Sequence, residues 1–371
     1  MTPASAADPI KIGLVTALSG QSARAGEALT RGLTIAIDEI NAKGGILGRP
    51  VELVRRDDEA NPAKGVLAAR ELVQREKVAV LIGGLDTPVA LAIVPFANSA
   101  KVPFVDPWAA GTAITHNGAN PNFVFRVSAM DDSVDKAIVQ YAMKTHGTKK
   151  PGLILVNNPW GESNEKGLLA ALKEVGIAPA GVEKFEGNDV DVVPQLSRLK
   201  QAGADALFLV GNVGPSAQVV KSLDRMGWMP PVVSHWGPAG GRFTELAGPS
   251  AKNVVFVQTY SFFGKLSPVG DRVLAALKAK YPDIKGPADV TPAVGVANAY
   301  DAMHLSAAAI AKAGSTDGAA IREGFYKIDR YEGLIKTYER PFSAQNHDAL
   351  NEGDYIWTRF EENHIMPVAT N

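Results

Sequence analysis

The loop at residues 83–88 contains residue types that suit the binding of a carboxylate. A buried run over 77–82 reads as a strand that ends at two glycines, and a helix over 88–99 starts with proline in its first turn. Asp86 or Thr87 can cap this helix. Because a helix start offers free backbone N–H groups and partial positive charge, the loop predicts an anion site. The carboxylate of Asp86 would repel an anion there unless it is paired or protonated.

Residue patterns typical of catalysis are absent from the sequence. The chain has no G-x-S-x-G elbow, no H-E-x-x-H, no Walker A loop, no G-x-G-x-x-G after its first strand and no cysteine. The acidic run at 57–59 follows a strand and is interpreted as a solvated loop or as the cap of the next helix, and not as a metal site. The net charge of −1 leaves no basic field for nucleic acid. We therefore expect a protein that is not an enzyme and needs no metal, cofactor or nucleic acid.

Hydrophobic periodicity predicts the elements that position this loop. Alternation over 12–15 and 51–55 indicates strands, and apolar residues spaced by three and four over 29–40 indicate a helix between them. This βαβ unit commits its strands to a parallel sheet. The alternation continues to residue 105 and restarts at 151, and it is followed by helices over 268–280 and 293–313. Strand-like runs at 331–339 and 355–360 break it. The fold class is therefore α/β with two parallel layers.

The N-terminal residues indicate in which cellular compartment the protein is expected. Residues 1–10, MTPASAADPI, lack a basic region and an apolar core, and they resemble a mature start left after A-x-A cleavage, with the leader replaced by Met. No run of eighteen apolar residues occurs. We expect a periplasmic protein whose signal peptide is absent from this chain.

The run INAKGGILGRPVELVRRDDEANPAKGVLAARELV, which starts at Ile40, joins a helix end, a strand and a second helix start. It resembles the opening of the periplasmic substrate-binding proteins of branched-chain amino acid ABC transporters. The resemblance implies a type I periplasmic binding protein fold, with two Rossmann-like lobes whose parallel sheets are flanked by helices. It also implies three hinge crossings, near 125–130, 257–262 and 333–342.

The implied domains are discontinuous. The crossings assign 8–126 plus 258–334 to lobe I and 127–257 plus 335–371 to lobe II. Periodicity alone would have divided the chain once, near residue 128. The ligand of such a fold is expected at strand-end loops in the cleft between the lobes.

The resemblance also implies site residues. Thr87 aligns with a serine that holds the ligand carboxylate in the family, and the backbone N–H groups of Ala109 and Ala110 could reach the same carboxylate. Asn212 falls at a ligand-lining position. Three tryptophans depart from the family pattern: Trp108 lies in a loop that usually reads serine-proline, Trp160 replaces a tyrosine, and Trp236 replaces an acidic residue that neutralises a ligand ammonium.

These departures change the expected ligand. Indoles at 108, 160 and 236 predict an aromatic pocket, and a buried ammonium without a counter-charge would cost several kcal/mol, which is more than ring packing returns. The expected ligand is an aryl acid without an amine, of the benzoate, phenylpyruvate or hydroxycinnamate type. We expect His235 or Asn212 to bond a ring hydroxyl or keto oxygen, Tyr260 to close over the ligand, and Arg24 to be a candidate partner of its carboxylate.

The resemblance implies a partner and leaves alternatives. The partner is an ABC transporter permease in the inner membrane, approached by a monomer after hinge closure. A branched-chain or other aliphatic amino acid is the alternative ligand. A quaternary ammonium ligand stays open because indole faces attract cations. A ligand-sensing component is a further alternative, since the same fold serves signalling receptors.

Overall fold

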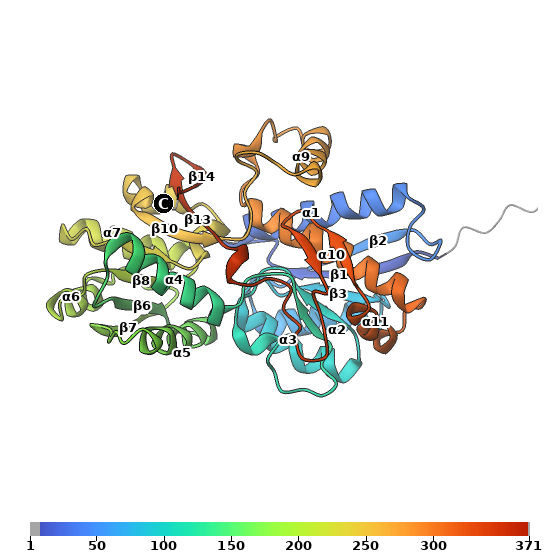
Figure 1. Cartoon of the computed structure of the whole chain (residues 1–371), viewed down its shortest axis with the longest axis horizontal. Coiled ribbons are helices and arrows are strands. Elements are labelled where there is room, and N and C mark those ends of the chain that lie inside the picture. Colours follow the sequence, from blue (N-terminus) through green and yellow to red (C-terminus); the bar gives the residue numbers. More distant parts are fainter. Residues whose placement is uncertain (1–7, 370–371) are drawn as a thin grey trace, which may run out of the picture.

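The structure, a computed structural model, describes residues 8–369 and contains two lobes that lie side by side (Figure 1). Lobe I is built on a parallel five-stranded sheet in the order β2-β1-β3-β4-β5. Its strands are β1 (Ile10–Thr16), β2 (Val51–Asp57), β3 (Val80–Gly83), β4 (Phe104–Asp106) and β5 (Val124–Arg126). All of β3, β4 and β5 is buried, as expected where helices cover both faces of a parallel sheet.

Helices from both ends of the chain cover this sheet. α1 packs against α10, α10 against α11, and α2 against α3. The helices of lobe I are α1 (Ala23–Ala42), α2 (Pro62–Gln74), α3 (Thr87–Ala100), α9 (Pro268–Lys280), α10 (Ala293–Ala313) and α11 (Gly318–Tyr326), with short turns η1 (Thr112–Ile114) and η4 (Pro287–Asp289). The N-terminal and C-terminal parts of the sequence therefore share one core.

Lobe II has a seven-stranded sheet in the order β14-β13-β10-β9-β8-β6-β7. The pairing is parallel from β10 to β7, whereas β13 pairs antiparallel with both β10 and β14. Its strands are β6 (Gly152–Val156), β7 (Gly181–Phe185), β8 (Leu207–Val210), β9 (Val232–Ser234), β10 (Val254–Gln258), β13 (Ile356–Glu361) and β14 (His364–Pro367). Antiparallel pairing lets β13 and β14 follow each other through a tight turn.

The helices of lobe II are α4 (Asp131–His146), α5 (Pro159–Glu174), α6 (Val193–Gln201), α7 (Val213–Met226) and α8 (Phe243–Ala247), with η2 (Gly237–Gly240) and η3 (Pro249–Asn253). The sequence of α4 fits its dipole, because Asp131 and Asp132 begin it and Lys144 and His146 lie in its last turn. Among the described residues, no helix has the length and apolarity that crossing a membrane requires.

The chain passes between the lobes three times. The first passage lies between the end of β5 at residue 126 and the start of α4 at 131, and the second between β10 and α9. The third differs from the sequence-based boundary. Residues 335–350 stay on lobe I. They include β12 (Thr337–Glu339), which forms a hairpin with the preceding β11 (Arg330–Glu332); the Ile335 N–H donates to Asp301 at 2.9 Å and the Ala349 N–H to the Arg126 carbonyl at 3.0 Å. Lobe II resumes only at β13, after η5 (Glu352–Asp354).

Candidate functional site

A small cavity lies where the two lobes meet. Loops at the carboxyl ends of strands from both sheets surround it, which is where open α/β sheets bind ligands. Its volume is about 30 Å³, so a benzoate-sized solute fits only when the two walls separate. The cavity is lined by Ser22, Leu85, Asp86, Thr87, Trp108, Ala109 and Ala110 of lobe I and by Trp160, Asn212, Val213, Trp236, Gly237 and Gly240 of lobe II.

Three tryptophans form most of the apolar wall. The rings of Trp108 from lobe I and Trp236 from lobe II have centroids 5.6 Å apart and planes tilted by 39°. Trp160 lies at the start of α5, where the Asn158 side chain accepts hydrogen bonds from the N–H groups of Trp160 and Gly161. All three indoles are nearly buried. The predicted aromatic pocket is therefore present as a set of neighbouring rings from both lobes.

The polar end of the cavity is formed by the start of α3. Asp86 is its N-cap residue, yet no side chain caps the first turn, so the N–H groups of Thr87 and Val89 have no helical partner. The Thr87 hydroxyl accepts a hydrogen bond from the Gly111 N–H at 3.2 Å and keeps its own proton to donate. This geometry suits a carboxylate, as the sequence predicts.

Asp86 joins the two lobes directly. Its Oδ1 accepts a hydrogen bond from Asn212 Nδ2 at 2.7 Å, whereas its buried Oδ2 has no hydrogen-bond partner. Burial raises the pKa of Asp86 to about 6, and the hydrogen bond from Asn212 opposes the shift. Among the described residues that line the cavity, Asp86 is the one ionisable side chain, and no lysine, arginine or histidine accompanies it.

In the loop after β4, the N–H groups of Ala109 and Ala110 were both expected to reach the ligand carboxylate, and the structure differs for Ala109. The N–H groups of Trp108 and Ala109 both donate to Asp106 Oδ1, at 2.9 and 2.7 Å, so the Ala109 N–H is already satisfied. The Ala110 carbonyl accepts a hydrogen bond from the Asp131 N–H at 2.7 Å. Both alanines line the cavity. Of their two N–H groups, only that of Ala110 is left to donate a hydrogen bond to a ligand carboxylate.

Three predicted site residues do not line this cavity. Arg24 projects from α1 with 43% of its side chain exposed and lies 3.9 Å from Glu245. Tyr260 lines a separate cavity at the second passage between lobes, where its ring contacts Phe262 edge to face. His235 is fully buried behind the wall, because it follows β9 with its side chain directed into lobe II.

His235 supports the aromatic wall. Its Nδ1 accepts a hydrogen bond from the Trp236 N–H at 2.8 Å, so the ring proton of the neutral form is on Nε2, 3.0 Å from Asp131 Oδ1. The same carboxylate oxygen accepts from Trp160 Nε1 at 3.1 Å. Through this bond, the hydrogen bond from its N–H to the Ala110 carbonyl and its close contact with the His235 ring, Asp131 touches all three tryptophan-bearing loops. The sequence signal for this residue was only an acidic helix start.

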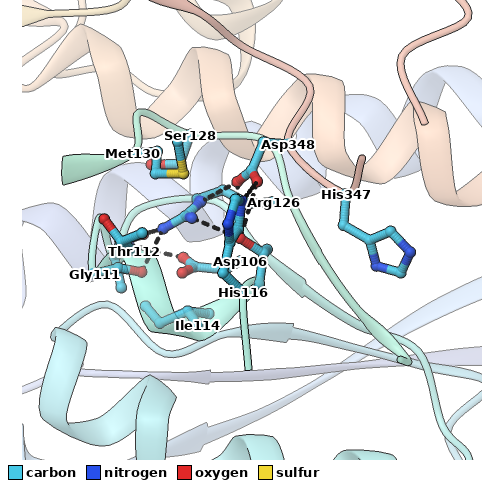
Figure 2. A network of polar contacts seen from close by, with 12 residues as sticks. Asp106, Gly111, Thr112, Ile114, His116, Arg126, Ser128, Met130, His347 and Asp348 are labelled. Carbon is cyan, nitrogen blue, oxygen red and sulfur yellow. Dashed lines mark hydrogen bonds and ion pairs between the residues drawn. The ribbon is translucent and has the colours of Figure 1, made fainter. Parts of the chain in front are cut away.

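A buried ion pair holds the loop that carries Trp108 (Figure 2). Arg126 Nε donates to Asp348 Oδ1 at 2.6 Å, and its other nitrogens donate to the Gly111 carbonyl at 2.8 Å and to Thr115 Oγ1 at 2.7 Å. The half-exposed His116 ring lies 3.1 Å from Asp348 Oδ2. We call Arg126, Asp348, Thr115 and His116 the Arg126 cluster. It ties the first passage between lobes to the third.

Comparison with known proteins identifies the family. A family model described as "Periplasmic binding protein" matches residues 9–357. The chain is 27% identical to Leu/Ile/Val-binding protein homolog 3 of Brucella melitensis, over 88% of this chain and 86% of that protein. It is similar, with a TM-score of 0.81 and 25% identity over 97% of this chain and all of that one, to the branched-chain amino acid transporter substrate-binding protein LivJ of Streptococcus pneumoniae in complex with isoleucine.

A third protein, similar in fold, has an aromatic ligand. The solute-binding protein of an ABC transporter from R. palustris in complex with 4-hydroxybenzoate has a TM-score of 0.83 to this chain at 22% identity, over 98% of this chain and 96% of that one, which shows a shared fold. The family match, the two-lobe architecture and the interlobe cavity agree with one another. The chain belongs to the periplasmic binding protein family, whose members are extracytoplasmic solute-binding proteins and not enzymes.

Proposed function

We propose that this protein is the periplasmic solute-binding component of an ABC importer and that it closes on a small aromatic carboxylate. The observation that carries the proposal is the composition of the cavity: indoles from both lobes, Trp108, Trp160 and Trp236, adjoin the uncapped start of α3. The α3 end is suited to the carboxylate and the indoles to the ring. Benzoate, phenylpyruvate and hydroxycinnamate types share these two parts.

The energetics favour a ring over an aliphatic chain. Offset or tilted aromatic pairs contribute about 0.5–1.5 kcal/mol beyond the burial of their area. Trp108 and Trp236 are already tilted relative to each other across the cleft, so a ring between them would contact both lobes at once. A solute that contacts both lobes stabilises the form in which they meet. The closed form is then the one that a permease distinguishes, and we propose that the protein reaches the permease as a monomer.

An aliphatic amino acid is the second candidate ligand. The relatives named for leucine, isoleucine and valine favour it, and this fold holds isoleucine in one relative and 4-hydroxybenzoate in another. Indole faces also pack well against aliphatic side chains. A ligand-sensing role would use the same cleft and the same closure. It differs from the transport role only in the partner protein that binds the closed form.

The first test is a thermal-shift screen of ligand-stripped protein with aryl carboxylates and amino acids side by side. A solute that binds only the folded state stabilises it by about 2.7 kcal/mol at a hundredfold excess over its Kd. We expect shifts with aryl carboxylates. Shifts confined to leucine-like amino acids would replace the aromatic ligand with the aliphatic one.

The second test removes one wall of the cavity. We expect Trp236→Ala to weaken the binding of the aryl acid at least about tenfold, because the variant loses the lobe II ring opposite Trp108. Trp228→Ala is the matched control, since Trp228 lines a different hollow beside β9. Titration calorimetry measures both. An unchanged Kd for Trp236→Ala would remove that indole from the site.

A further inference from the structure

Asp86 has an unusual place for an acidic side chain in a site that is expected to take an anion. It lies at the start of α3 and lines the interlobe cavity. A little of the residue's surface is exposed, but its Oδ2 atom is buried and lacks a partner, while Oδ1 is held by Asn212. Buried carboxylate oxygens are normally hydrogen-bonded, so the free oxygen requires a donor that the described protein residues do not supply.

The surroundings of Asp86 add negative charge and no positive charge. Asp58, in the loop after β2, is buried near Asp86, and burial followed by the charges of Asp86 and Asp57 raises the pKa of Asp58 to about 7. Asn212, the partner of Asp86 from lobe II, is neutral. A bare aryl carboxylate would therefore enter beside one or two acids with no cation to balance them, which is unfavourable in a buried site.

We propose that Asp86 is the specificity-determining residue of the cleft and that its free oxygen receives an ammonium group of the solute. This proposal rests on the proposed function for the ring and the carboxylate of the solute, and it replaces the amine-free acids named there with an aromatic acid that has an amino group next to its carboxylate. The sequence argument against an amine assumed that the only possible counter-charge was the acidic residue replaced by Trp236. The structure provides a carboxylate from the opposite lobe.

The geometry of neighbouring residues supports this class of solute. Asp86 and Thr87 are consecutive, so their side chains and the free N–H groups of α3 lie at one end of the cavity. In an α-amino acid the ammonium and the carboxylate are attached to one carbon, and adjacent residues can bind them together. Lobe I would then bind the whole polar end, and lobe II would contribute mainly Trp160 and Trp236 to the ring.

The test uses three solutes of one shape with the purified full chain. Phenylalanine has an ammonium, 3-phenyllactate a hydroxyl and 3-phenylpropionate no donor at the same carbon. By titration calorimetry we expect phenylalanine to bind at least about tenfold more tightly than 3-phenylpropionate. In Asp86→Asn we expect this preference to disappear through weaker binding of phenylalanine. Asp132→Asn, which removes an exposed acid outside the cavity, should leave the preference unchanged.

Several outcomes would overturn the proposal. It fails if wild-type protein binds 3-phenylpropionate as tightly as phenylalanine, if 3-phenyllactate binds most tightly, or if Asp86→Asn keeps the wild-type preference. Leucine and its amine-free analogue 4-methylpentanoate separate it from the proposed function. If only this pair binds and leucine is preferred in an Asp86-dependent way, the aromatic ligand is rejected and the role of Asp86 stands. If no carboxylate of either class binds, both are rejected.

Discussion

Two groups of charged residues lie at the two ends of the first passage between lobes, and they differ in how completely their charges are paired. In the Arg126 cluster, the guanidinium of Arg126 has an acidic partner, a hydroxyl and a carbonyl within hydrogen-bond distance. Five residues further on, α4 begins with Asp131 and continues to Asp135, whose two carboxylate oxygens are buried and have no partner.

The difference between these groups predicts different roles. Burial opposes ionisation of Asp348, but the charge of Arg126 and the bond from His116 outweigh it and hold the pKa of Asp348 well below its usual range. Burial, with the charges of Asp131 and Asp132, raises the pKa of Asp135 well above its usual range. The paired cluster stabilises one loop geometry, whereas the unpaired carboxyl of Asp135 makes the stability of lobe II depend on pH.

The largest expected effect comes from breaking the paired cluster. Arg126→Met leaves Asp348 buried without its cation and removes the bond to the Gly111 carbonyl, so we expect a loss of about 3–5 kcal/mol in the free energy of unfolding. Urea unfolding at pH 7 measures it. Arg225→Met, which breaks a half-exposed pair with Asp191, is the control and should lose no more than about 1 kcal/mol.

A double variant separates lost charge balance from lost packing. Arg126→Met with Asp348→Leu removes both charges, and we expect it to recover part of the loss because no unpaired charge stays buried. Acid gives a parallel test. Since the folded-state pKa of Asp348 is depressed, its contribution is present above about pH 4 and is lost as pH falls through the folded pKa. A loss below about 1 kcal/mol for Arg126→Met would contradict the stabilising role.

Elements with local signals could be predicted from the sequence. Helices predicted over 268–280 and 293–313 have those bounds in the structure, because their apolar spacing and terminal residues are contained in the segments themselves. The third passage between lobes could not be predicted in this way. Residues 340–350 are mostly irregular. The distant Arg126 backbone holds them, because its N–H donates to the His347 carbonyl and its carbonyl accepts from the Ala349 N–H.

In the site, too, features with local sequence signals could be predicted, and features that depend on contacts between distant residues could not. The start of α3 and the strand-end positions of three tryptophans follow from local pattern and resemblance, and the structure gathers them around one cavity. The Ala109 N–H was misjudged because Asp106 accepts it, although an aspartate two and three residues before free N–H groups is a known local competitor. The sequence could not show that the His235 side chain points into lobe II and away from the cavity. It also could not show that Asp131 contacts the three tryptophan-bearing loops, because these contacts join distant parts of the chain.

The next effect concerns the unpaired carboxyl of Asp135. Because the folded-state pKa of Asp135 is raised, the folded protein keeps a proton that the unfolded chain releases, so stability is fully present below about pH 4 and falls as pH rises toward the folded pKa. Asp135→Asn keeps the shape and removes the titration. We expect it to gain about 1–3 kcal/mol at pH 8 and little at pH 4.

Urea unfolding of wild-type protein and Asp135→Asn at several pH values measures this gain. Asp224→Asn is the control, since Asp224 is an exposed acid of the same lobe, on α7, and is not one of the charges that raise the pKa of Asp135, so no comparable gain is expected. An equal gain for Asp135→Asn at pH 4 and pH 8 would show that packing, and not ionisation, distinguishes the variant. Asp135 and the Arg126 cluster would then differ in how their side chains pack, and not in how their charges are paired.

The smallest effect lies at the rim of the paired cluster. The hydrogen bond to Asp348 raises the pKa of His116, so the protonated ring stabilises the fold fully below about pH 6.5 and loses this effect as pH rises through the folded pKa. His116→Gln keeps a donor but not the charge. Because the ring is 57% exposed, we expect a loss of at most about 1 kcal/mol at pH 5.5 and none at pH 8.5.

Salt distinguishes the rim of the cluster from its centre. Ion pairs that face solvent are screened at 1 M salt, where the Debye length is about 3 Å, whereas buried pairs are screened much less. The difference between wild-type protein and His116→Gln at pH 5.5 should therefore shrink in 1 M salt, while the loss in Arg126→Met persists. If both losses shrink equally, solvent reaches the centre of the cluster, and Arg126 and His116 act as one exposed network.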